Sequence, residues 1–220
     1  MSDQLTLAVD ASTYRGTVAL LAAGRVIATS EIAMRGEREE RLMPAIAAAL
    51  GSAGAAVADL GAVVVGGGPG SFTSLRIGAA LAKGICVARG VPLASMPSLA
   101  LLVAGTDVPV ADGRYLAILD AMRGDVYAAV IESVGGTVVR VSDPRLAPRA
   151  AVPGLARDHG ARVVGAGESV DSAPHAKGLA RLDPSLVQQV SLAAWEPAYG
   201  RLAEAQVKWE TEHGRSLATG

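Results

Sequence analysis

The sequence predicts an α/β protein built as two lobes. Strand and helix patterns alternate along the first half of the chain, which is the arrangement of α/β folds. Half of the 220 residues are apolar and only 3% are aromatic, so the chain can bury a sizeable core of Ala, Val, Leu and Ile. A glycine-rich turn also links a buried strand to a long alanine-rich helix pattern. We place the first lobe at residues 1–108 and the second, with a tail helix, at 109–220.

The first half is predicted as three strands, a helix, a strand, a helix, a strand and a helix. They are expected at 5–10, 16–22, 25–31, 38–50, 60–65, 73–89, 91–95 and 97–104. Pro44 either kinks the helix of 38–50 or marks a later start for it. This order is that of the ribonuclease-H-like unit found in actin-like ATPases, sugar kinases and Hsp70 chaperones. By that analogy we expect two actin-like (ASKHA) lobes, each a mixed sheet flanked by helices.

The second half is less regular. Strands are expected at 115–120, 126–131, 137–141 and 162–165, helical turns near 179–181 and 185–194, and an amphipathic tail helix at 202–213. A connection punctuated by proline joins 144 to 153. The sequence shows no clear copy of the first lobe in this half.

The glycine-rich turn begins at Gly66 and runs Gly-Gly-Gly-Pro-Gly-Ser. Its composition indicates a sharp turn at the carboxyl end of a strand, where open α/β sheets place ligand or partner surfaces. It lacks the Gly-Lys-[Ser/Thr] ending of a phosphate-binding P-loop, because the next lysine is Lys83. Ser71 is expected to cap the following helix and Gly90 to end it.

Asp10 closes the first predicted strand and is followed by Ala11, Ser12 and Thr13. In actin-like ATPases an acid at this place positions magnesium, and a glycine in the turn after it allows phosphate to approach. Ser12 stands where that glycine would be, and its side chain hinders such an approach. Asp10, Ser12 and Thr13 are therefore candidate nucleotide contacts, and a structural acid that caps its own loop is an equal alternative.

No set of catalytic residues is apparent in the sequence. His159, His175 and His213 lie far apart without metal-ligand spacing, so we expect surface histidines and no metal. Cys86, the single cysteine, lies within a helix pattern and is expected to be buried and unreactive. Ser71 is better explained as a helix cap than as a nucleophile.

Composition limits the compartment and the partners. A net charge of −1 argues against a chain that grips nucleic acid alone. One cysteine suits a reducing compartment, the first residues lack the pattern of a signal peptide, and no apolar run reaches the ~18 residues of a membrane span. We therefore expect a cytoplasmic protein that does not enter a membrane.

The helix predicted at 73–89 carries apolar residues around nearly its whole circumference, and the helix predicted at 38–50 has an apolar face. A helix that is apolar all round needs neighbours on every side. We expect one side to pack on the sheet and the other to meet another chain, with packing wholly inside the subunit as the alternative. The predicted contact residues are Leu42, Met43, Ile46, Phe72, Thr73, Arg76, Ile77, Leu81 and Ile85.

The chain resembles the bacterial TsaB (YeaZ) family in four segments that follow one another from the first strand to the tail. They are Val9–Thr13, Gly66–Arg76, Leu119–Tyr127 and Pro197–Arg201. The Gly-Pro-Gly-Ser-Phe-Thr-Ser-Leu-Arg stretch is the most specific of them. Met122 is a departure, because many members have arginine there.

The resemblance implies an accessory subunit in the synthesis of threonylcarbamoyladenosine in tRNA. The family's paralogous catalytic subunit, TsaD, would transfer the threonylcarbamoyl group to N6 of adenosine 37, and this chain would dock on it through its first-lobe helices. TsaD binds a metal through a His-x-x-x-His pair on its first-lobe helix, and the matching residues Glu39–Ile46 contain no histidine. That absence favours a non-catalytic subunit.

The resemblance further implies recruitment of the ATPase TsaE, a homodimer when the chain is alone, and contact with tRNA only through the complex. ATP or ADP is expected, if anywhere, at the partner interface, with no cofactor required by this chain.

The alternative is an enzyme that acts alone, either an actin-like ATPase or kinase or a glycoprotease-like peptidase. The first needs Asp10 and a phosphate turn that Ser12 impairs. The second needs a nucleophile–base pair or a metal, and the sequence offers neither. The accessory subunit is therefore the preferred interpretation.

Overall fold

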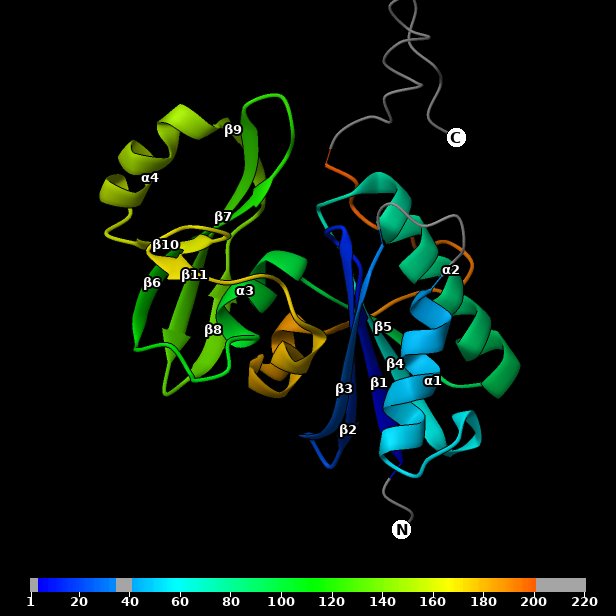
Figure 1. Cartoon of the computed structure of the whole chain (residues 1–220). Coiled ribbons are helices and arrows are strands. Elements are labelled where there is room, and N and C mark those ends of the chain that lie inside the picture. The colour runs from blue at the N-terminus through cyan, green and yellow to red at the C-terminus, as the bar shows by residue number, and fades with distance from the viewer. Residues whose placement is uncertain (1–3, 35–40, 201–220) are drawn as a thin grey trace, which may run out of the picture.

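The computed structural model describes residues 4–34 and 41–200. Two mixed sheets lie side by side, and the longer helices cover their outer faces (Figure 1). Three short helices lie between the sheets: η2 (Ser98–Ala100), α3 (Leu101–Ala104) and η4 (Ala176–Arg181). The remaining short helices are η1 (Val57–Asp59), η3 (Arg149–Ala151) and η5 (Pro184–Leu186).

The first sheet has the strand order β12-β5-β4-β1-β2-β3. Its strands are β1 (Leu5–Asp10), β2 (Arg15–Ala22), β3 (Arg25–Ala33), β4 (Leu60–Gly66), β5 (Leu93–Met96) and β12 (Gln188–Gln189). β1, β2 and β3 are antiparallel, whereas β4 and β5 run parallel to β1. On the face away from the second lobe, α1 (Leu42–Ser52) packs on β2 and β3, and α2 (Phe72–Arg89) packs on β1 and β4.

The second sheet repeats this topology. Its strands are β6 (Gly113–Asp120), β7 (Asp125–Val134), β8 (Thr137–Val141), β9 (Arg145–Pro148), β10 (Arg162–Gly165) and β11 (Val170–Asp171). The order β8-β7-β6-β10-β11, antiparallel at one end and parallel at the other, matches β3-β2-β1-β4-β5. The second half therefore holds a copy of the first lobe that was not clear from the sequence pattern, and the predicted class of two actin-like lobes is confirmed.

The two lobes share one hydrophobic core, and their interface is buried. Ala8 and Leu21 of the first sheet join Tyr115 and Ile131 of the second in a single buried cluster, with all of α3 inside it. A second cluster lies between the first sheet and its two helices, and a third lies under α4 (Val152–Asp158). Because α3 is buried on all sides, its four apolar residues need no polar face.

The chain does not stay in the second lobe after residue 109. β12 pairs antiparallel with β5 at the edge of the first sheet, and Val190 N–H donates to Leu93 O at 3.0 Å. Leu192 and Trp195 then pack against the core beneath α1 and α2. A second lobe that takes in all of 109–220 is therefore wrong, because residues 188–195 pair and pack with the first lobe.

Local signals set the ends of α1 and α2. The Ser71 side chain accepts from Ser74 N–H at the start of α2, and Gly90 ends that helix in the left-handed conformation at φ 65°. α1 begins at Leu42, which puts Pro44 in its first turn, where a missing N–H breaks no helical bond. The later-start interpretation of Pro44 is therefore confirmed, while residues 38–40 of the predicted helix lie outside the described part.

Four elements of the second lobe were not predicted: β9, η3, α4 and β11. The proline-punctuated stretch contains β9, which pairs with β7, and the start of α4, with Pro153 in its first turn. The predicted tail helix at 202–213 lies outside the described residues. Among the residues that the structure describes, none of the helices has the length and apolar character needed to cross a membrane.

Candidate functional site

The glycine-rich turn packs directly on the turn that follows β1. Ser71 N–H donates to the Ser12 carbonyl oxygen at 2.7 Å. A Cβ at Gly70 would overlap that same carbonyl, so only glycine lets the two turns approach this closely. A Cβ at Gly66 would likewise overlap the carboxyl group of Asp10. The glycines therefore serve the contact between two loops of the protein itself.

Asp10 is completely buried, and both oxygens of its carboxyl group accept hydrogen bonds from neighbouring serines. The Ser12 N–H and hydroxyl donate to Oδ1 at 3.1 and 2.7 Å, and the Ser98 hydroxyl donates to Oδ2 at 2.6 Å. Burial raises the pKa of Asp10 above its ordinary value of 3.8, against the opposing effect of the serine hydrogen bonds. A buried carboxyl held in this way disfavours charge and has no oxygen turned to solvent.

These contacts do not fit a nucleotide phosphate at Asp10 and Ser12. Both oxygens of the Asp10 carboxyl group already accept from serine donors, and the Ser12 hydroxyl is turned to Asp10. The Thr13 hydroxyl donates to Arg15 O and accepts from Arg15 N–H at 3.2 and 3.1 Å, so it closes the same turn. The geometry favours the interpretation of Asp10 as an acid that caps its own loop.

Ser98 is the residue of this site that sequence analysis missed. Its hydroxyl accepts from Gly68 N–H at 3.0 Å and donates to Asp10, so it joins the glycine-rich turn to β1. It sits in η2, directly after β5, and is completely buried. A serine just after Pro97 reads as an ordinary helix start, so nothing in the local sequence indicates this role.

The segment Pro197–Gly200 lies across the glycine-rich turn. Ala198 N–H donates to Gly67 O at 2.8 Å, and the ring of Tyr199 lies 4.5 Å from that of Phe72. From the second lobe, the Tyr127 hydroxyl donates to Tyr199 O at 3.2 Å. This segment therefore ties the two lobes together over the turn.

The outward face of α1 and α2 is the second part of the site. α1 contains no charged residue, and Met43, Pro44, Ala47 and Ala48 are exposed on it. On α2, Ala80, Gly84 and Val87 are exposed, and Val87 reaches 72%. A helix that faces water ordinarily carries charges on that side. On α1 this face carries no charge, whereas on α2 the exposed Arg76 and the half-buried Lys83 share it with Ala80 and Val87. The small side chains allow another helix to approach closely.

The structure divides the nine predicted contact residues. Leu42, Ile46 and Ile85 lie in the subunit's own core, so their assignment to an interface is wrong. The other six, Met43, Phe72, Thr73, Arg76, Ile77 and Leu81, are exposed or half-buried and stay a prediction. The Arg76 guanidinium lies 5.4 Å from the centre of the Phe72 ring. The apolar pattern of α2 suggested a helix that is buried on every side. In the subunit, however, the face that carries Val87 is exposed to solvent.

The histidines and the cysteine make no catalytic set among the described residues. His175 is buried, which contradicts the expectation of a surface histidine, and its Nε2 lies 3.5 Å from Oε1 of Glu31. His159 lies half-buried at the end of α4, and His213 is outside the described part. Cys86 is buried, and burial raises the pKa of its thiol. The described residues hold no cluster of metal-binding side chains.

The second lobe carries a counterpart of the Asp10 turn. Asp120 ends β6 as Asp10 ends β1, an alanine follows in both, and Met122 N–H donates to Asp120 Oδ1 at 2.9 Å. Asp120 is exposed, unlike Asp10. Met122 and Arg123 adopt positive φ angles of 64° and 57°, a conformation that non-glycine residues rarely hold. The turn therefore resembles the Asp10 turn in its aspartate–backbone hydrogen bond but lacks the buried acid.

Fold and site together define a protein of two actin-like lobes whose Asp10 turn is closed by its own side chains. The family model described as "TsaD: tRNA N6-adenosine threonylcarbamoyltransferase" matches residues 31–191. The chain therefore belongs to that family, and within it to the TsaB (YeaZ) proteins.

Two curated relatives are named tRNA threonylcarbamoyladenosine biosynthesis protein TsaB. The one from Bacillus subtilis is 36% identical over 136 residues, which cover 61% of this chain and 58% of the relative. The one from Escherichia coli is 35% identical over 123 residues, which cover 56% and 53%. The aligned part thus spans little more than half of these relatives. YeaZ from Pseudomonas aeruginosa superposes with a TM-score of 0.71 at 26% identity, covering 89% of this chain and 99% of that one.

Proposed function

We propose that this chain is a non-catalytic scaffold subunit of the machinery that makes threonylcarbamoyladenosine at position 37 of tRNA. It docks on the catalytic TsaD subunit through the outward face of α1 and α2. The curated relatives named for this biosynthesis support the pathway. A closed Asp10 turn and the lack of a catalytic set among the described residues support the accessory role.

The observation that carries the proposal is the uncharged outward face of α1 beside the exposed Ala80, Gly84 and Val87 of α2. The apolar core of a protein interface is depleted of charged residues and packs as tightly as a protein interior. A second pair of helices can lie against small side chains at such a face. The same face suits a second copy of this chain, so we propose a homodimer when TsaD is absent.

Sedimentation velocity with purified TsaD tests the proposal. Val87→Glu should weaken the heterodimer about tenfold or more, because a carboxylate would be buried without a partner. Val108→Glu is the matched control, since Val108 is as exposed, at 76% against 72%, but lies in the connection between α3 and β6. A heterodimer that survives Val87→Glu unchanged, with both variants folded, contradicts the docking face.

An ATPase, kinase or peptidase that acts alone is the competing function. Asp10 is the carboxylate that an actin-like ATPase would need, and here it is sealed by Ser12 and Ser98. The purified chain should therefore hydrolyse ATP no faster than its Asp10→Asn variant. Robust turnover that disappears in Asp10→Asn would favour the enzyme. Recruitment of TsaE, and ATP or ADP at the surface shared with TsaD, remain parts of the proposal for the assembled complex.

A further inference from the structure

Within the described ranges, the outer face of the second sheet has less helical cover than its counterpart in the first sheet. In the first lobe, α1 covers β2 and β3 while α2 covers β1 and β4. In the second lobe the single helix α4 packs on β6 and β10, the counterparts of β1 and β4. α4 shares a buried cluster with Val126 and Ala128 at the start of β7, but among the described residues no counterpart of α1 packs on the outer face of the rest of β7 and of β8.

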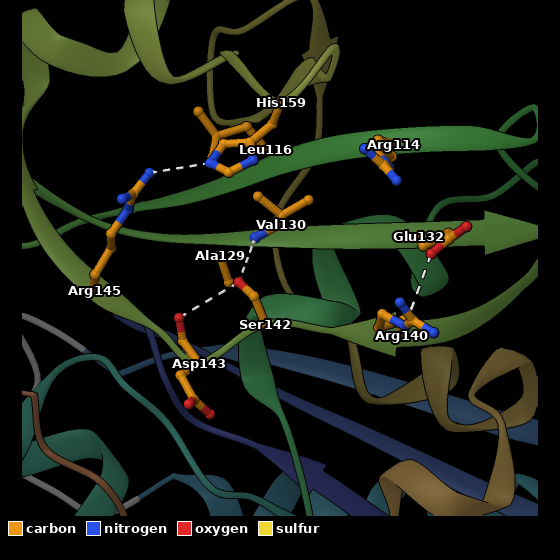
Figure 2. A pocket seen from close by; sticks show the side chains of 10 residues that line it. All are labelled: Arg114, Leu116, Ala129, Val130, Glu132, Arg140, Ser142, Asp143, Arg145 and His159. Atoms are coloured by element: carbon orange, nitrogen blue, oxygen red, sulfur yellow. Dashed lines mark hydrogen bonds and ion pairs between the residues drawn. The ribbon is translucent and has the colours of Figure 1, made fainter. Parts of the chain in front are cut away.

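A hollow of about 430 Å³ lies on this uncovered face. Figure 2 shows its lining: Arg114, Arg140 and Arg145 surround it with His159, and Leu116 and Val130 form its floor. Beside this floor, the Ser142 hydroxyl oxygen accepts a hydrogen bond from Val130 N–H at 2.9 Å. The hollow is thus a cationic rim around an apolar base.

The strand register places the cations in two separate rows. Arg114, Glu132 and Arg140 lie opposite one another across β6, β7 and β8. Arg145 lies opposite Ala128 of β7, four residues before Glu132. At about 3.3 Å for each residue, the two rows are roughly 13 Å apart along β7. His159 stands with Arg145 at the second row, where the guanidinium donates to Nε2 at 3.4 Å.

Three guanidinium groups outnumber the two carboxylates of the hollow. Glu132 is held by Arg140 at 3.9 Å, and Asp143 lies between the rows. The Arg140 side chain is 80% exposed, so it can turn to an incoming anion at little cost in desolvation. Guanidinium groups bind phosphate oxygens through two parallel donors.

We propose that this hollow, the arginine hollow, binds the phosphate backbone of RNA, a role that rests on the proposed function of the chain. Two cationic rows roughly 13 Å apart are too far apart for one phosphate group and suit an extended polyanion. An open hollow on a sheet face also suits a ligand that lies mostly outside it. With a chain of net charge −1, the contact adds to the affinity of the complex and does not supply it alone.

The test uses the full chain in complex with TsaD and a fluorescent tRNA transcript that carries adenosine at position 37. Affinity is measured across a series of salt concentrations for the wild type and for Arg114→Gln/Arg145→Gln, which removes one arginine from each row. The control is Arg25→Gln/Arg157→Gln, which removes two exposed arginines outside the hollow. A parallel titration measures ATP binding to the same proteins.

Each phosphate contact contributes about 0.7 to 0.9 to the slope of log affinity against log salt. The slope should therefore fall by about 1.4 to 1.8 in the hollow variant and stay unchanged in the control. Equal slopes in the two variants overturn the proposal. ATP binding that is lost in the hollow variant without a change in the tRNA slope also overturns it, in favour of a free nucleotide.

The failure of this inference and of the proposed function can be told apart by sedimentation of the same samples. Heterodimers that form normally while the slopes stay equal leave the scaffold function standing. An unchanged thermal midpoint of the hollow variant shows that it is folded.

Discussion

The hydroxyl of Ser98 donates to Oδ2 of Asp10 at 2.6 Å across 88 positions of the chain. Because the same hydroxyl accepts from Gly68 N–H, one buried side chain holds the β1 turn and the glycine-rich turn together. The β1 turn and the glycine-rich turn thereby form a structural joint in this protein. Four predictions test the joint and its surroundings.

Ser98→Ala should lower the free energy of unfolding by about 1–3 kcal/mol, because it leaves Gly68 N–H without this acceptor and Asp10 without this donor, both buried. Urea unfolding measures the loss. Ser52→Ala is the control, since Ser52 is exposed and donates only to Ala48 O within α1. Equal losses in the two variants would show that the joint contributes nothing.

Gly70→Ala should disturb the joint from the other side, because its Cβ would overlap the Ser12 carbonyl. We expect a loss of about 1–3 kcal/mol, as for other overpacked positions. Gly84→Ala is the matched control, since its Cβ meets nothing and alanine stabilises an exposed helix position by about 0.4–1 kcal/mol. Thermal unfolding of both variants checks the opposite signs.

The stability contributed by Asp10 should fall as the pH rises. Burial raises its pKa in the folded protein above the ordinary 3.8, so the folded state holds the proton more tightly than the unfolded state. The contribution is complete below pH 3.8 and is lost as the pH rises through the folded-state pKa. The wild type should therefore lose stability relative to Asp10→Asn on going from acid to neutral pH. A constant difference between the two would contradict this.

His175 should show the opposite pH dependence. Burial, and secondarily Lys177, lower its pKa below 6.5, so the folded protein favours the neutral ring. Its contribution is present above pH 6.5 and is lost as the pH falls through the folded-state pKa. In His175→Asn the amide oxygen can still accept from Lys177 N–H, as Nδ1 does at 3.0 Å. Denaturant unfolding should show a flatter pH dependence in this variant below pH 6.5.

Local signals in the sequence were enough to place most of the first lobe. Ser71 and Gly90 bound α2 because each satisfies a helix end by itself. Pro44 left a kink and a later start of α1 open, and the structure has the later start. The return of β12 to β5 could not be predicted, since two residues carry no periodicity and their pairing is set by distant packing.

Burial within a helix was harder to assign than the helix itself. The pattern marks Leu42, Ile46 and Ile85 as apolar but does not say which neighbour covers them, and the sheet does so here. His175 looked like a surface residue because no local feature shows that η4 is packed between the lobes. A signal that was available is the repeated Asp-Ala at the ends of β1 and β6, which indicates the second copy of the fold.

β12 makes the first sheet, which is built mainly from the first hundred residues, depend on a segment much later in the chain. The edge strand β12, which pairs with β5, is synthesised roughly a hundred residues after the other strands of this sheet. A nascent amino-terminal half therefore has an unfilled strand position, and truncation ahead of Gln188 leaves the backbone of β5 open to pairing with other molecules. Synthesis of the second lobe is thus a condition for completing the first.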